Sequence, residues 1–207
     1  MMIQVFIIAF VVSYLGSIPP GTINVTTMQL AVQQKNRTAI FFSIAASLVE
    51  FVYAGLTVRF QLFLNESPWI MDNFYIITAI AMIVLGIANL FATSNSKSIV
   101  AKIDTRARSG FKRGIILGLL NPLTMPFWLA VTAFLQTNNL ISLNGSHFWF
   151  YLAGISSGTF ILLMTILKLG TRFITIADNP FLVHKLPGLI FIGLGCYNLF
   201  IWGSTFS

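Results

Sequence analysis

Two apolar segments of this chain are each interrupted by proline, at matching places in its two halves: residues 16–21 (GSIPPG) and 118–122 (GLLNP). Proline removes a backbone donor and clashes with the preceding turn, so it frees backbone polar groups in a helix. Lipid cannot satisfy such groups, so a broken membrane helix survives only where it faces protein or a watery cavity. A broken helix in each half is the pattern that marks a transporter's binding site.

The composition indicates a membrane protein. Of the 207 residues, 57% are hydrophobic and 8% are charged, far more apolar than one soluble core requires. We therefore predict an all-α membrane protein. Stretches of about 20 apolar residues predict six transmembrane helices, at Ile3 to Val25, Ala39 to Phe60, Phe74 to Ala92, Gly114 to Gln136, Phe148 to Lys168 and Leu186 to Gly203.

The basic residues orient the predicted helices. Eleven of the 12 fall in the first, third and fifth loops: Lys35, Arg37, Lys97, Lys102, Arg106, Arg108, Lys112, Arg113, Lys168, Arg172 and Lys185. By the positive-inside rule these loops are cytoplasmic and both termini lie outside. We interpret residues 97–113 as a solvated basic loop rather than a site for lipid or nucleic acid, and predict no nucleic-acid partner.

Three predicted helices in each half mean that the second half enters the membrane from the opposite face. We therefore predict two inverted three-helix repeats, with the first helix of each half broken at proline. The predicted units are residues 1–95, a basic cytoplasmic loop at 96–113, and residues 114–207.

Glu50 is the only acid inside a predicted span. An ionised carboxylate at that depth costs roughly 2.5 to 3.5 kcal/mol, so Glu50 is expected to face the bundle interior, to pair, or to be protonated. The functional interpretation is a proton-coupling or substrate-ammonium site. The alternative is a neutral, hydrogen-bonded packing residue.

Five residues at the two breaks are candidates for substrate binding: Pro20, Gly21, Asn24, Asn121 and Pro122. The two asparagines flank the broken segments, where freed carbonyls and N–H groups need partners. They are expected either to cap half-helices alone or also to line a cavity. In that cavity, half-helix N-termini would attract a carboxylate, and C-termini with Glu50 would attract an ammonium.

A serine-hydrolase interpretation is excluded, although residues 154–158 (GISSG) fit the G-x-S-x-G pattern. That pattern needs a strand-to-helix turn beside a histidine and an acid. Here the run lies in a predicted span, and His147 and His184 lie at opposite membrane faces. We predict no enzymatic activity and no cofactor, and we expect the serines of this run and Thr159 to hydrogen-bond across helices.

Two other classes were weighed. A divalent metal-ion exporter of related architecture would present several intramembrane ligands, whereas this chain offers Glu50 alone, so no metal site is predicted. A non-transporting membrane scaffold has no need for paired broken helices. The single cysteine, Cys196, excludes a CxxC redox carrier.

Several short motifs resemble the LysE/RhtB family of amino-acid exporters. The family's proline-glycine signature and following basic turn are similar to residues 20–22 (PGT) and 34–37 (QKNR). Its fourth span, with a glycine, an Asn-Pro pair and an aromatic run, resembles residues 111–128. Thr22 and Leu123 depart from the family's usual proline and basic residue.

This resemblance covers essentially the whole chain. It implies a secondary exporter of amino acids or related small metabolites, driven by the proton gradient, in a bacterial inner membrane. Glu50 is similar in position to an acidic residue of the family's second span. Cargo identity and whether the protein forms a homo-oligomer stay open at this point.

Overall fold

The computed structural model describes residues 2–18, 22–64, 74–91, 107–121, 124–170, 181 and 185–205. Within these residues every regular element is helical, so the prediction of an all-α protein is confirmed there. The helices are α1 (Met2–Gly16), α2 (Thr22–Val32), α3 (Asn36–Leu64), α5 (Phe74–Phe91), α6 (Ala107–Leu119), α7 (Thr124–Thr137), α8 (Ser146–Leu169) and α10 (Leu186–Thr205).

Both predicted breaks appear as gaps between helices. α1 ends at Gly16 and α2 begins at Thr22, while α6 ends at Leu119 and α7 begins at Thr124. The prolines fall in these gaps, and Pro20, Gly21 and Pro122 themselves lie outside the described residues.

Part of the segment predicted as the basic loop at 96–113 is helical. α6 begins at Ala107, so residues 107–113 are helical. The prediction relied on charge, but alanine, arginine and lysine are good helix formers, and packing of this segment against α3 stabilises the extra turns. Residues 96–106 lie outside the described residues.

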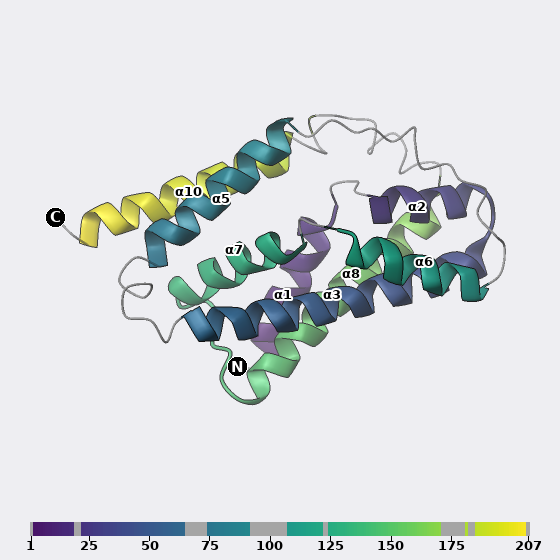
Figure 1. Cartoon of the computed structure of the whole chain (residues 1–207), viewed down its shortest axis with the longest axis horizontal. Coiled ribbons are helices and arrows are strands. Elements are labelled where there is room, and N and C mark those ends of the chain that lie inside the picture. The colour runs from purple at the N-terminus through teal and green to yellow at the C-terminus, as the bar shows by residue number, and fades with distance from the viewer. Residues whose placement is uncertain are drawn as a thin grey trace.

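Among the described residues, two helices are long and apolar enough to cross a membrane on their own, over Asn36–Gln61 and Ser146–Leu169. The other apolar helical stretches are shorter: Met2–Gly16, Ile76–Ala88, Phe127–Thr137 and Gly188–Ser204. α3 and α8 cross each other near the centre of the molecule (Figure 1), where the Ser156 hydroxyl donates to the Ser47 carbonyl over 2.9 Å.

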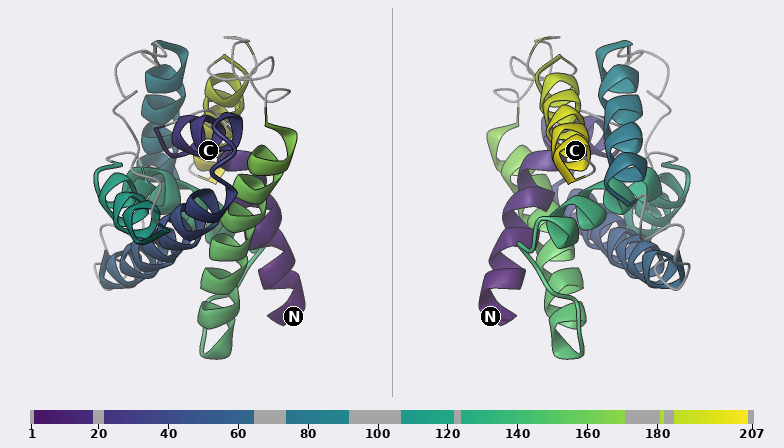
Figure 2. Two further views of the ribbon diagram at one scale, coloured as in Figure 1. Left: turned by 90° about the vertical axis from the view of Figure 1, so that its right-hand side faces the viewer. Right: turned by 90° about the vertical axis from the view of Figure 1, so that its left-hand side faces the viewer.

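Helix α1 packs along α8 through glycine (Figure 2). A Cβ atom at Gly154 would lie 2.5 Å from the Phe6 carbonyl oxygen, and one at Gly158 would lie 2.5 Å from the Phe10 carbonyl oxygen. The glycines of the 154–158 run therefore let the two backbones pack closely. Because both contacts advance in the same direction along the chain, the two helices run parallel.

Helix α6 packs along α3 in the same way, through three glycines spaced four residues apart. Gly110 contacts Thr38, Gly114 contacts Phe42 and Ala45, and Gly118 contacts Val49. A Cβ at Gly118 would lie 2.9 Å from the Val49 Cβ. These helices also run parallel, and their contact brings the second break beside Glu50.

Helices α5 and α10 form an antiparallel pair at one side of the molecule (Figure 1). Gly86 and Gly188 let the backbones approach, and the buried Asn198 amide donates to the Thr78 hydroxyl over 3.0 Å. α5 joins the rest of the protein through α7. The pair therefore supports α7, which carries part of the candidate site.

Candidate functional site

Glu50 lies in the middle of α3, half-buried, with both carboxyl oxygens in hydrogen bonds. The indole Nε1–H of Trp128 on α7 donates to Oε1 over 3.1 Å. The hydroxyl of Thr159 on α8 shares a hydrogen bond of 2.5 Å with Oε2. Of the three expected alternatives for Glu50, the hydrogen bonds to Trp128 and Thr159 bear out pairing.

A second hydroxyl extends this cluster to α1. Ser13 Oγ lies 2.9 Å from Thr159 Oγ1 and donates to the Ile155 carbonyl over 2.7 Å. Ser13, Trp128 and Thr159 are all buried. The polar cluster of Ser13, Glu50, Trp128 and Thr159 thus joins four helices, in a setting where each hydrogen bond is electrostatically stronger than in water.

The first break is capped by Asn24 of α2. Its side-chain amide donates to the Ser17 carbonyl over 2.6 Å and approaches the Ile18 carbonyl at 3.4 Å. These carbonyls belong to the end of α1, which has no further helical donors. Asn24 therefore caps the half-helix, and its contact with substrate stays a prediction.

The second break is capped from another helix. The Tyr53 hydroxyl of α3 donates to the Leu119 carbonyl, at the end of α6, over 2.7 Å. Asn121 forms a backbone turn, because its N–H donates to the Gly118 carbonyl and its own carbonyl accepts from the Thr124 N–H. Tyr53 lies one helical turn after Glu50, so α3 contacts the break and carries the acid.

Aromatic rings fix Trp128. Its ring meets those of Phe127 and Tyr151 edge to face, at centroid distances of 4.9 and 6.4 Å. The Tyr151 hydroxyl is bonded to Thr132 over 2.8 Å. Phe127 also fills the space over Gly16, where a Cβ would lie 2.6 Å from the ring, so α7 contacts the end of α1 as well as Glu50.

The structure thus brings Glu50 close to the second break and places Asn24 as the capping residue of the first break. The predicted interhelical bonds of Ser156 and Thr159 are confirmed. Sequence reasoning missed Ser13, Tyr53 and Trp128 as partners. Two signals were available: Ser13 is a lone serine in an apolar helix, and Trp128 belongs to the aromatic run after the Asn-Pro pair.

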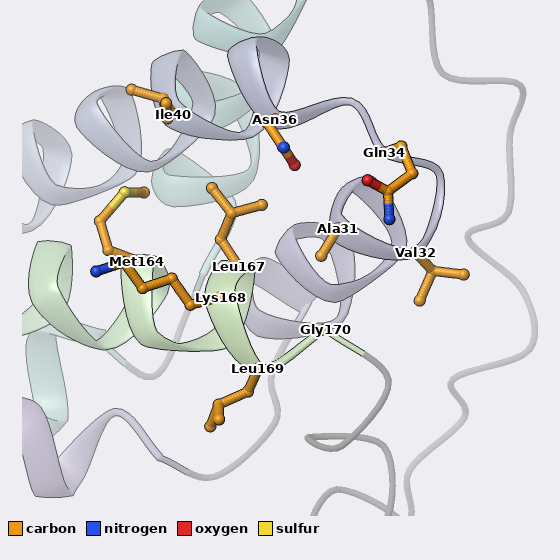
Figure 3. Close-up of a pocket in the computed structure, with 10 residues that line it drawn as sticks. All are labelled: Ala31, Val32, Gln34, Asn36, Ile40, Met164, Leu167, Lys168, Leu169 and Gly170. Carbon is orange, nitrogen blue, oxygen red and sulfur yellow. The ribbon is translucent and has the colours of Figure 1, made fainter.

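A separate pocket of about 560 Å³ lies between the ends of α2 and α8 and the start of α3 (Figure 3). Gln34 presents its amide from the α2–α3 turn and Asn36 from the start of α3, while Met164 and Leu167 present apolar groups from α8. Lys168 lines it with its long side chain. Its nearest lining residue on α8, Met164, lies five residues after Thr159, and the pocket does not include Glu50.

Comparison with known proteins gives one match. A family model described as LysE type translocator matches residues 14–201, and this range includes Glu50, Trp128, Thr159 and both breaks. No curated protein and no solved structure matches the chain.

Proposed function

Because this chain belongs to the LysE type translocator family, we propose that it exports amino acids or closely related small metabolites, driven by the proton-motive force. Proteins of this family are transporters and not enzymes, and the chain is a multi-pass membrane protein that carries a small-molecule substrate. The proposal concerns the cargo, the direction of transport and the energy source.

The observation that carries the proposal is the placement of Glu50. It is the only acidic side chain among the described residues, and it lies where α1, α3, α7 and α8 meet, close to the second break. A carboxyl group in a membrane interior is costly and is typical of proton relays and ion pathways. Glu50 is the proposed proton-coupling residue.

The two breaks supply the proposed substrate contacts. A helix N-terminus attracts negative charge and a C-terminus attracts positive charge. At each break a C-terminus (α1 or α6) meets an N-terminus (α2 or α7), so each offers groups for both the carboxylate and the ammonium of an amino acid. Pro20, Gly21, Asn24, Asn121 and Pro122 are the proposed lining residues.

Two inverted repeats of three membrane spans account for the order and direction of the helices. α1 and α6 each run parallel to the long helix of the other half, which is the exchange that an internal twofold axis produces. In both halves glycine, proline and threonine recur at equal spacing, at residues 16, 20 and 22 and at residues 118, 122 and 124. The proposed units are residues 1–95 and 114–207.

Both termini are proposed to lie outside a bacterial inner membrane, since the basic loops mark the cytoplasmic face. Cysteines introduced at Asn144 and Ser207 should react with an impermeant reagent on intact cells. A cysteine at Ser98 should react only after permeabilisation. Labelling of Ser98 in intact cells would contradict this orientation.

The export proposal is tested in proteoliposomes loaded with a mixture of amino acids. Under an imposed pH gradient, specific members should leave faster than from protein-free vesicles. Exchange of amino acids at equal gradients identifies the cargo independently of proton coupling. Exchange without gradient-driven efflux would contradict proton coupling, and no movement of any member in either assay would contradict the amino-acid cargo.

A further inference from the structure

Three pairs of oxygen atoms in the polar cluster lie at hydrogen-bond distance, and each pair needs a hydrogen between its two atoms. The contacts run in series from Glu50 Oε2 to Thr159 Oγ1 (2.5 Å), from there to Ser13 Oγ (2.9 Å), and on to the Ile155 carbonyl oxygen (2.7 Å). Each separation is within the range for O–H···O bonds. Each bond holds one hydrogen between its two oxygens.

A carboxylate at Glu50 leaves this series one proton short. The Ile155 carbonyl and an ionised carboxylate can only accept, and each hydroxyl brings a single hydrogen. Ser13 and Thr159 together would then supply two hydrogens for three contacts. Whichever contact went without, two oxygen atoms would face each other at hydrogen-bond distance with no hydrogen between them.

A protonated carboxyl removes the shortage. We infer that Glu50 is the neutral acid in this conformation, with its proton on Oε2, and that Ser13 and Thr159 are positioning residues that hold it there. Glu50 donates to Thr159, Thr159 donates to Ser13, and Ser13 donates to the Ile155 carbonyl. Oε1 is then the carbonyl oxygen of the acid, and it accepts from the Trp128 indole.

The arrangement links the proton to helix packing. Ser13 is on α1 and Thr159 is on α8, and the backbones of these helices touch at Gly154 and Gly158. Loss of the proton would place two acceptor oxygens against each other at this tight contact. Relief then requires a change at this contact, either a new rotamer of Ser13 or Thr159 or a shift of α1 from α8, so the ionisation of Glu50 acts on the packing of the helix that leads into the first break.

No other titratable group is bonded to the Glu50 carboxyl among the described residues. Its partners are Trp128 and Thr159. Helices α1, α2 and α7 carry no charged side chain, and Arg59 on α3 and Lys168 on α8 lie nine residues, or about 13 Å, from Glu50 and Thr159 respectively. The remaining titratable or cationic side chains on α1, α3, α6 and α8 are Tyr14, Arg37, Tyr53, Arg108, Lys112, Arg113, His147 and Tyr151.

The inference deepens the proposed coupling function but is tested without transport. Infrared difference spectra of the purified full-length protein, wild type minus Glu50→Gln, should contain the carboxylic-acid C=O band of Glu50 at neutral pH. That band should be lost as the pH rises. A carboxylate band at neutral pH in place of the acid band would overturn the inference.

Replacement of Ser13 tests the positioning contacts. In Ser13→Ala only the contact between Glu50 and Thr159 remains. The Thr159 hydroxyl can then donate its hydrogen to an ionised Glu50, so the carboxylate form is no longer short of a hydrogen bond. The pH at which the acid band disappears should fall by about half to one unit, the worth of one hydrogen bond. An unchanged midpoint would overturn the assignment of Ser13.

Ser43→Ala is the matched control. Ser43 is buried on α3 and donates to the Ala39 carbonyl of its own helix over 2.9 Å, so its loss removes the same atoms outside the cluster. The midpoint should stay at the wild-type value. A midpoint that falls equally in both variants would contradict the inference. If the wild-type protein gives the expected spectra but exports no amino acid, the proposed function alone would be contradicted.

Discussion

The two helix breaks differ in which side chain satisfies their freed carbonyls. At the first break the cap is local, because Asn24 of α2 reaches back six and seven residues to Ile18 and Ser17. At the second break the cap comes from Tyr53, 66 residues away on α3. The same helix carries Glu50, and Glu50 in turn is bonded to Trp128 on α7.

Both ends of the second break therefore contact α3, the helix that carries the acid. Tyr53 contacts the last turn of α6, and Glu50 contacts the first turns of α7. A shift of α3 would move both contacts together. The first break touches the acid only indirectly, through Ser13 and Thr159. We expect changes at the second break to affect coupling more strongly than changes at the first.

The largest effect is expected at the acid that both breaks share. Glu50→Gln should abolish uphill efflux under a pH gradient, because the amide cannot exchange a proton, while exchange at equal gradients should persist. The glutamine amide can donate to Thr159 and accept from Trp128, so the protein should fold normally. Glu50→Asp should keep partial activity with a shifted pH optimum.

The measurement is gradient-driven efflux from proteoliposomes, normalised to the amount of folded protein. If Glu50→Gln performs uphill efflux at the wild-type rate, Glu50 is a neutral packing residue. The contacts of each break with Glu50 would then give no reason to expect different effects at the two breaks.

An intermediate effect is expected from Tyr53→Phe, which deletes the hydroxyl that caps the second break. Losing one hydrogen bond should reduce stability by about 1 kcal/mol. If that bond orients α6 against α3 during the cycle, uphill efflux per folded protein should fall about tenfold, which corresponds to about 1.4 kcal/mol. Thermal unfolding and efflux are measured on the same preparation. A stability loss with unchanged efflux would contradict the link between Tyr53 and coupling.

The smallest effect on transport is expected from Asn24→Ala at the first break. Loss of the hydrogen bond to the end of α1 should lower stability by about 1 kcal/mol, and loss of a proposed lining residue should lower efflux per folded protein by about threefold, less than in Tyr53→Phe. The matched comparison is Asn138→Ala, since Asn138 donates within its own segment to the Phe134 carbonyl over 2.9 Å. A larger loss of coupling in Asn24→Ala than in Tyr53→Phe would reverse the comparison, because it would make the first break the more important one for coupling.

Several elements could be predicted because their signal is local. Hydropathy and proline placed both breaks, and depth in the apolar run of α3 singled out Glu50 as an acid that had to face the interior, pair or be protonated. The helical start of α6 was not foreseen, since the charges of Arg108, Lys112 and Arg113 resemble those of a loop. The packing of its glycines against α3 decides that segment, and a partner surface is not visible in a hydropathy profile.

The sequence by itself determined that the chain belongs in a membrane, that it has two broken helices, and that a single acid lies within an apolar span, because composition, proline chemistry and depth act residue by residue. The tertiary structure alone decided the partners of that acid. Ser13, Trp128 and Thr159 are separated from Glu50 by 37, 78 and 109 positions. They meet it because glycine contacts let α1 lie against α8 and α6 against α3, and such long-range packing is not written in any local pattern.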